Sequence, residues 1–101
     1  MKTYKLDTDF GNYEVIIERK FYGNGNLAIL LTDARDGDAI AKITTNLFDL
    51  PDDLAFLDTN NCPWAEDFVE KYGIAENTGK TAKSGFCTYP LYRFNLSKME
   101  A

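Results

Sequence analysis

Apolar and polar residues alternate along residues 12–22, which is the pattern of a β-strand with one buried and one solvated face. A Gly-Asn-Gly-Asn segment at 23–26 is typical of a hairpin turn, and the continuously apolar residues 27–31 predict a central strand covered on both faces. After a second turn signal at 36–37, alternation resumes over 39–47. These segments predict a three-stranded antiparallel meander.

Two neighbouring segments extend this pattern. Tyr4 and Leu6 predict a short leading strand before a turn signal at 9–11. One face of the strand at 12–22 carries the side chains that we expect in the core, namely Tyr13, Val15, Ile17 and Phe21. Residues 48–62 are rich in Asp and are expected to be a connection. The apolar residues expected to hold this connection on the core are Leu50, Leu54, Phe56 and Leu57.

Residues 63–72 change to the period of an amphipathic helix. Large aromatic side chains recur at every fourth position, at Trp64, Phe68 and Tyr72. Asn61 is the expected N-cap of this helix, and Gly73 followed by an apolar residue has the form of a glycine C-cap. We expect the polar residues 75–85 to form a loop after the helix.

Residues 86–96 hold four aromatic side chains and predict a final strand that is largely apolar on both faces. We expect one face of this strand, with Tyr92 and Phe94, to belong to the core; the same face also carries Phe86, Thr88, Pro90 and Leu96. Pro90 has no N–H to donate, which predicts an edge position or a bulge. The other face of the strand, together with two lysines of the preceding loop, is the candidate partner-binding surface: Tyr89, Leu91, Arg93, Lys80 and Lys83.

The length and composition agree with one domain over residues 1–101. Its apolar fraction of 45% is enough for a core without a disulfide or a structural metal. The expected fold is α+β, with a mostly antiparallel sheet of four to six strands packed against the helix at 63–72. Because no apolar run reaches the roughly 18 residues of a membrane span and no secretory signal pattern is present, we expect a soluble cytoplasmic protein.

Charge is distributed unevenly in this acidic chain, whose formal net charge is −5. Residues 33–70 contain ten acidic residues against Arg35 and Lys42, whereas residues 71–101 have a net positive charge. Acidic surfaces repel phosphate backbones, which disfavours nucleic acid as a partner and favours another protein. A single-stranded nucleic acid stacked on the C-terminal aromatic and basic strand and loop remains the alternative.

Catalytic chemistry is poorly represented in the sequence. The chain has no histidine, which excludes Ser-His and Cys-His nucleophilic pairs, and its two cysteines, Cys62 and Cys87, are not spaced as metal ligands. A weaker hypothesis is that Cys62 is a nucleophile, because the dipole of the following helix would lower the pKa of its thiol. The Gly-Lys-Thr at 79–81 lacks the spacing and the strand-to-helix context of a phosphate-binding loop. We therefore expect no enzyme activity, no cofactor and no catalytic or metal-binding residue.

Acidic residues cluster at Asp33, Asp36 and Asp38 around Gly37. A calcium loop needs acids at alternate positions and a distant glutamate, and this segment has neither. The turn-forming properties of Asp and Gly explain the cluster directly.

Two longer segments carry a family resemblance: Asp-Thr-Asn-Asn-Cys-Pro-Trp-Ala-Glu at 58–66 and Ser-Gly-Phe-Cys-Thr-Tyr-Pro-Leu-Tyr-Arg-Phe at 84–94. Residues 25–29 and 45–47 are also similar to the same pattern. The chain resembles a family of small uncharacterised bacterial proteins, a domain of unknown function often carried on conjugative transposons and related mobile elements. The resemblance implies a mobile-element context but no activity. From the residues and this context together, we expect a non-enzymatic accessory protein that acts by protein–protein interaction.

Overall fold

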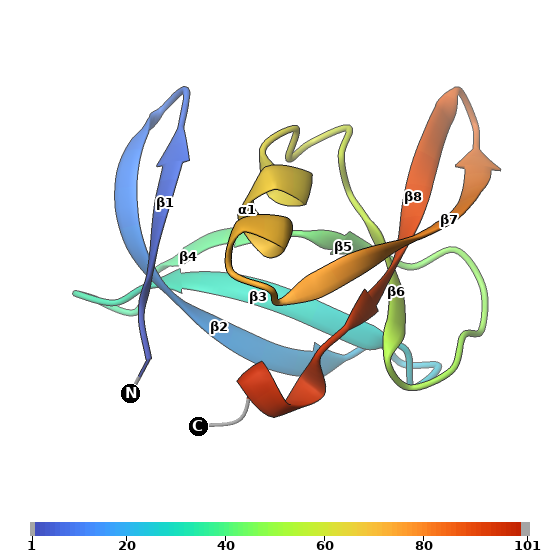
Figure 1. Cartoon of the computed structure of the whole chain (residues 1–101), viewed down its shortest axis with the longest axis horizontal. Helices are drawn as coiled ribbons and strands as arrows, with labels where there is room; N and C mark the ends of the chain where they lie inside the picture. The colour runs from blue at the N-terminus through green and yellow to red at the C-terminus, as the bar shows by residue number, and fades with distance from the viewer. Residues whose placement is uncertain (1, 100–101) are drawn as a thin grey trace.

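The computed structural model describes residues 2–99 and contains two four-stranded antiparallel sheets and one α-helix (Figure 1). The first sheet has the order β1-β2-β3-β4, with β1 at Tyr4–Thr8, β2 at Gly11–Phe21, β3 at Leu27–Asp33 and β4 at Ala39–Lys42. The second has the order β5-β6-β8-β7, with β5 at Thr44–Thr45, β6 at Leu54–Leu57, β7 at Ala75–Ser84 and β8 at Cys87–Phe94. Helix α1 spans Ala65–Lys71, and a 3-10 helix, η1, spans Leu96–Met99. The α+β class is confirmed, whereas two sheets replace the single sheet that we expected.

The first sheet is the predicted meander with its leading strand. Strand β3 is central, between β2 and β4, and Ile17 of β2 lies opposite Leu31 of β3. The predicted strand at 39–47 is divided at Ile43, because β4 and β5 belong to different sheets. The amide of Ile43 donates to the Ile29 carbonyl at 3.0 Å, and its carbonyl accepts from the Asp58 amide at 2.8 Å. Ile43 thus connects the two sheets through its own backbone.

The main core combines side chains from both sheets and from α1. Its fully buried members with the largest side chains include Tyr92, Leu27, Ile29, Leu31, Ile43 and Leu57. Tyr92 and Phe94 are buried as predicted. Phe21 was predicted on the core face of β2 but is 62% exposed, because β2 continues past the core before the β2–β3 turn.

Helix α1 is shorter than the predicted range of 63–72. The N-cap position belongs to Trp64, and no side chain caps the helix there, so the predicted role of Asn61 is wrong. The Asn61 side-chain amide instead donates to Asp58 Oδ2 at 2.9 Å. The predicted C-cap is confirmed, since Gly73 has a φ of +65° and the buried Ile74 donates its amide to the Val69 carbonyl at 2.8 Å.

Two strands arise where the sequence predicted none. Strand β6 lies within the expected connection at 48–62, and β7 occupies most of the expected polar loop at 75–85. Strand β7 is the edge of its sheet and is mostly solvated on both faces, so it has no apolar alternation to reveal it. Strand β6 has only four residues, which is too short for a periodic pattern.

The buried side chain of Asn26 fixes the connection between β5 and β6. Its amide nitrogen donates to Asn46 Oδ1 at 2.8 Å and to the Phe48 carbonyl at 2.6 Å. Its amide oxygen accepts the Leu50 N–H at 2.9 Å. One side chain at the β2–β3 turn therefore satisfies three polar groups of a loop that is distant in sequence.

Candidate functional site: a projecting hairpin and the groove at its base

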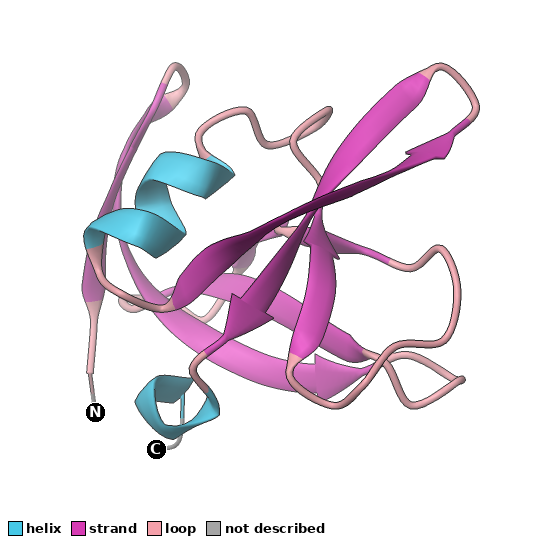
Figure 2. Cartoon of the chain, turned by 45° about the vertical axis from the view of Figure 1, so that its right-hand side comes forward, coloured by secondary structure: helices cyan, strands magenta, loops and turns pink. Residues whose placement is uncertain are grey.

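The second sheet ends in a hairpin that extends beyond its other strands. Strand β6 pairs with β8 from Leu91 to Arg93, whereas from Thr81–Pro90 to Ser84–Cys87 β8 pairs with β7 alone. We call residues 80–90 the hairpin arm. Figures 1 and 2 show it rising away from β6, on the same side of the molecule as the β1–β2 hairpin end, with α1 between the two. Two-stranded hairpins are marginally stable alone, so the arm depends on what holds its base.

A bulge in β7 marks the base of the arm. The register shifts between Asn77 and Thr81, and Gly79 within this interval has a φ of +84°, a conformation that favours glycine. The Gly79 amide donates to Asn77 Oδ1 at 2.8 Å, and Thr78 Oγ1 donates to the Leu91 carbonyl of β8 at 2.9 Å. The Gly-Lys-Thr at 79–81 thus belongs to an exposed strand bulge and not to the loop expected there.

Strand β8 is fastened to α1 by Tyr92. Its phenol donates toward Glu66 Oε2 at 2.7 Å and Glu70 Oε2 at 2.8 Å, two carboxylates one turn apart on the helix. Burial and these two carboxylates raise the pKa of Tyr92 above its ordinary value, so the phenol keeps its proton. On the other face of β8, Arg93 Nε lies 3.4 Å from Asp53 Oδ2.

Three of the five predicted partner-binding residues lie around one groove. Lys80, Leu91 and Arg93 line a hollow of about 390 Å³ at the base of the arm. The other lining residues are Leu54, Glu76, Asn77 and Thr78. Leu91 is buried and forms part of the floor, whereas Lys80 and Arg93 are exposed. Lys83 and Tyr89 lie farther out on the arm, away from the groove.

A small apolar cluster supports the face of the second sheet that carries Leu91 and Arg93, which we call the outer face. Phe56 of β6 is 2% exposed and lies opposite Leu91 of β8, and neither belongs to the main core. The ring of Phe48 contacts the Phe56 ring edge-on, with centroids 5.3 Å apart, while Phe48 itself is half exposed. The outer face therefore offers apolar surface next to the basic side chains of the arm.

Sequence reasoning missed the most exposed aromatic side chain of the arm. Phe86 was grouped with the core-facing positions, but it lies in the turn between β7 and β8 and is fully exposed. Gly85 before it has a φ of +61°, and this turn glycine was the available signal. Phe10, in the β1–β2 turn, is the other almost fully exposed phenylalanine among residues 2–99.

The two thiols occupy different environments, and both are free. Cys62 is buried, and its burial together with the nearby Asp58 carboxylate raises the pKa of the thiol to about 11. A reactive thiol needs a lowered pKa, so the raised pKa of Cys62 argues against the nucleophile hypothesis. Cys87 is half-buried on the arm, and the interaction of its side chain with Tyr89 raises the pKa of the Tyr89 phenol.

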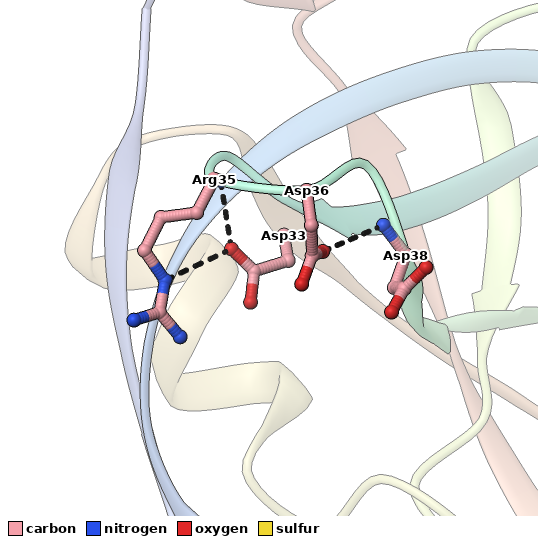
Figure 3. A network of polar contacts seen from close by, with 4 residues as sticks. All are labelled: Asp33, Arg35, Asp36 and Asp38. Carbon is pink, nitrogen blue, oxygen red and sulfur yellow. Dashed lines mark hydrogen bonds and ion pairs between the residues drawn. The ribbon is translucent and has the colours of Figure 1, made fainter.

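The acidic cluster after β3 is engaged in its own turn (Figure 3). Asp33 Oδ1 accepts the Arg35 amide at 2.8 Å and lies 3.6 Å from Arg35 Nε, while Asp36 Oδ1 accepts the Asp38 amide at 3.0 Å. Gly37, between them, has a φ of +79°. These contacts confirm the turn interpretation of the cluster. Within residues 2–99, no group of three or more His, Cys, Asp or Glu side chains is arranged to hold a metal ion.

A family model described as a domain of unknown function (DUF4313) matches residues 16–101. The chain belongs to this family. The match begins within β2 and includes the whole second sheet, the groove and the hairpin arm, while β1 lies outside it. The DUF4313 assignment agrees with the resemblance to a domain of unknown function drawn from 58–66 and 84–94. Comparisons with curated proteins and with solved structures found no match. None of the helices within residues 2–99 has the length and apolar content needed to cross a membrane.

Proposed function

We propose that this protein is a non-enzymatic accessory protein that binds another protein through the hairpin arm. The observation that carries this proposal is the arm itself, which projects from the second sheet and exposes Phe86 completely. An aromatic side chain kept in water at the end of a hairpin gains nothing in the isolated fold. In contact with a partner it supplies the kind of anchor that dominates binding energy.

Charge supports a protein partner with an acidic surface. Residues 77–92 contain no acidic residue, and both Lys80 and Lys83 are exposed. The arm is thus locally basic in a chain whose net charge is −5. Such a local field steers an acidic partner toward the arm and away from the rest of the surface.

Nucleic acid is the weaker candidate, because the arm offers few phosphate contacts. Two lysines fall short of the roughly six to ten contacts that give strong, salt-dependent DNA binding. Arg93 cannot add a free charge, since it pairs with Asp53. Tyr89 and Phe86 can each stack on a base, but without more cations they do not hold a polyanion against an acidic body.

We also propose a mobile-element context, as the family resemblance leads us to expect, and a cytoplasmic location, which agrees with the two free thiols. In that setting the partner is a protein of the host cell or of the element. The raised pKa of Cys62 and the self-contained hydrogen bonding of the acidic turn support a binding role over catalysis.

The test is affinity capture from a lysate of the organism that encodes the chain, with cross-linking and mass spectrometry. The variants are Phe86→Ser and the double variant Lys80→Glu/Lys83→Glu. Phe10→Ser is the matched control, because it removes an equally exposed phenylalanine from the other hairpin. We expect both arm variants to lose the same captured protein and the control to keep it.

Salt titration of the captured complex separates the charge contribution from the aromatic one. We expect the wild-type complex to weaken between 50 and 500 mM NaCl, on the order of tenfold, as screening reduces the lysine attraction. Capture that both arm variants retain would refute the proposal. Fluorescence anisotropy with single-stranded oligonucleotides at low salt tests the alternative, and micromolar binding that depends on Tyr89 would favour nucleic acid instead.

A further inference from the structure

We infer that the partner adds an extended acidic segment as a strand to the free edge of β7 in the hairpin arm. This inference rests on the proposed function and specifies how the arm would bind. Strand β7 is the outermost strand of its sheet, and residues 79–84 are exposed except for the half-buried Ala82. An uncovered edge presents unpaired N–H and C=O groups, which are a template for an added strand.

The other edge of the arm is less suitable. Pro90 lies on β8 where that strand has left β6, so this edge lacks one amide donor. On the β7 edge, residues 80–84 contain no proline and include two lysines, whereas residues 87–90 of the β8 edge carry no charged side chain. The two edges therefore differ in both hydrogen-bonding capacity and charge.

The two lysines lie on opposite faces of this edge. Ala82 is opposite Tyr89 and Lys83 is opposite Thr88, so Lys83 points to the face away from Tyr89. Lys80, in contrast, lines the groove on the face of Leu91 and Arg93. A strand added to β7 would consequently have one lysine on each of its faces. Carboxylates three residues apart, which also lie on opposite faces of a strand, complement this arrangement.

Charge also argues against a second copy of the chain as the occupant. Pairing of two β7 edges brings together two segments that each carry Lys80 and Lys83, with no acidic residue from 77 to 92 to offset them. Like charges directly opposite each other are destabilising. The same two lysines that oppose self-pairing attract an acidic strand.

The bulge limits the length of the added strand. The regular part of β7 in the arm runs from Thr81 to Ser84, after the register shift that follows Asn77. A ladder of this length gives few backbone hydrogen bonds, so the expected affinity of a short peptide is weak, with a Kd of about 0.1–1 mM.

The test uses a synthetic peptide, acetyl-Thr-Val-Glu-Thr-Val-Glu-Thr-Val-amide, added at 1 mM to the full chain. Hydrogen exchange of the β7 amides is followed by NMR. We expect the outward-facing amides among residues 81–84 to exchange more slowly, by roughly fivefold, because protection grows with the ratio of peptide concentration to Kd. One control peptide has lysine in place of both glutamates, and another has proline in place of its central threonine, which keeps the charge but removes strand pairing.

The matched protein variant reverses the charge of both lysines of the arm. Lys80→Glu/Lys83→Glu should lose its response to the glutamate peptide and gain a response to the lysine peptide. Equal protection by the proline peptide would show charge attraction alone and overturn strand addition, as would unchanged exchange of the β7 amides at 1 mM peptide. If the cellular partner is captured in an arm-dependent way yet leaves the β7 edge unprotected, edge pairing is wrong while the proposed function stands.

Discussion

Two buried tyrosines differ in what their hydroxyl groups contact, and this difference predicts opposite effects of the same substitution. The Tyr92 hydroxyl lies between two glutamate carboxylates of α1, at 2.7 and 2.8 Å. The Tyr4 hydroxyl is buried without a hydrogen-bond partner in the described part of the chain. Tyr92→Phe should therefore destabilise the fold, whereas Tyr4→Phe should be neutral or stabilising.

The magnitudes follow from the surroundings of each hydroxyl. A hydrogen bond to a charged group contributes about 1.5–3 kcal/mol. Because Glu66 is half-buried and Glu70 is exposed, water replaces part of the interaction, and we expect a loss of about 1.5 kcal/mol for Tyr92→Phe. That loss lowers Tm by roughly 6–12 °C in a domain of this size. Tyr4→Phe removes a desolvated hydroxyl and should raise the free energy of unfolding by about 0–1 kcal/mol.

Urea unfolding followed by circular dichroism measures both variants. The midpoint should fall for Tyr92→Phe and hold or rise for Tyr4→Phe, with equal m-values, because neither change alters the surface exposed on unfolding. Tyr4→Phe serves as the control for removing a hydroxyl from a buried ring. The reasoning fails if Tyr4→Phe costs as much stability as Tyr92→Phe.

The remaining predictions concern the loop network, the helix end and the buried thiol. Asn26→Ala should lower the free energy of unfolding by about 2–3 kcal/mol, since it leaves buried partners unsatisfied, while Asn24→Ala on the exposed side should cost less than about 1 kcal/mol in the same urea titration. Gly73→Ala should cost about 1–2 kcal/mol at its positive φ, measured by thermal unfolding. Iodoacetamide should label Cys87 in the native protein and Cys62 only on unfolding, as mass spectrometry can check. The folded-state pKa of Cys62 is raised from 9.0 to about 11, so the protonated thiol stabilises the fold below pH 9 and this contribution is lost as the pH rises toward 11. Between pH 9 and 11 the free energy of unfolding should therefore fall less for Cys62→Ala than for the wild type.

The first sheet could be predicted from the sequence because its strands separate buried from solvated faces. Val15 and Ile17 of β2 and the apolar run of β3 carry that pattern directly. The C-terminal end of α1 could also be predicted from the sequence, because the chain reverses there through the left-handed backbone conformation of Gly73. Local chemistry was sufficient in these segments.

Apart from β8, the second sheet could not be predicted from the sequence, because its pairings are long-range and its edge is polar. From Glu76 to Thr81, β7 has no apolar side chain whose alternation would indicate a strand. Strand β6 pairs with β8 across a large sequence separation, from Leu54 to Arg93, which no local pattern encodes. The predicted N-cap at Asn61 failed because its side chain bonds to Asp58 instead of the helix.

The candidate surface was predictable in its composition but not in its shape. Alternation correctly separated Tyr92 from Arg93 on the last strand. It gave no indication that β8 loses β6 as a neighbour beyond Leu91, which is what makes residues 80–90 project. It also assigned Phe86 to a strand face, whereas the turn at Gly85 moves that ring into solvent.

The backbone of Ile43 has a consequence for the order of folding. The first sheet consists of sequential hairpins with low loop-closure cost, so it can form early, during synthesis of the N-terminal half. The Ile43 amide donates to the Ile29 carbonyl, which holds Ile43 at the border of the first sheet. The Ile43 carbonyl then accepts the amide of Asp58, the residue after β6. The completed N-terminal meander thereby supplies a template for the second sheet. The arm, whose two strands pair only with each other, is then the segment that opens at least cost to the rest of the molecule.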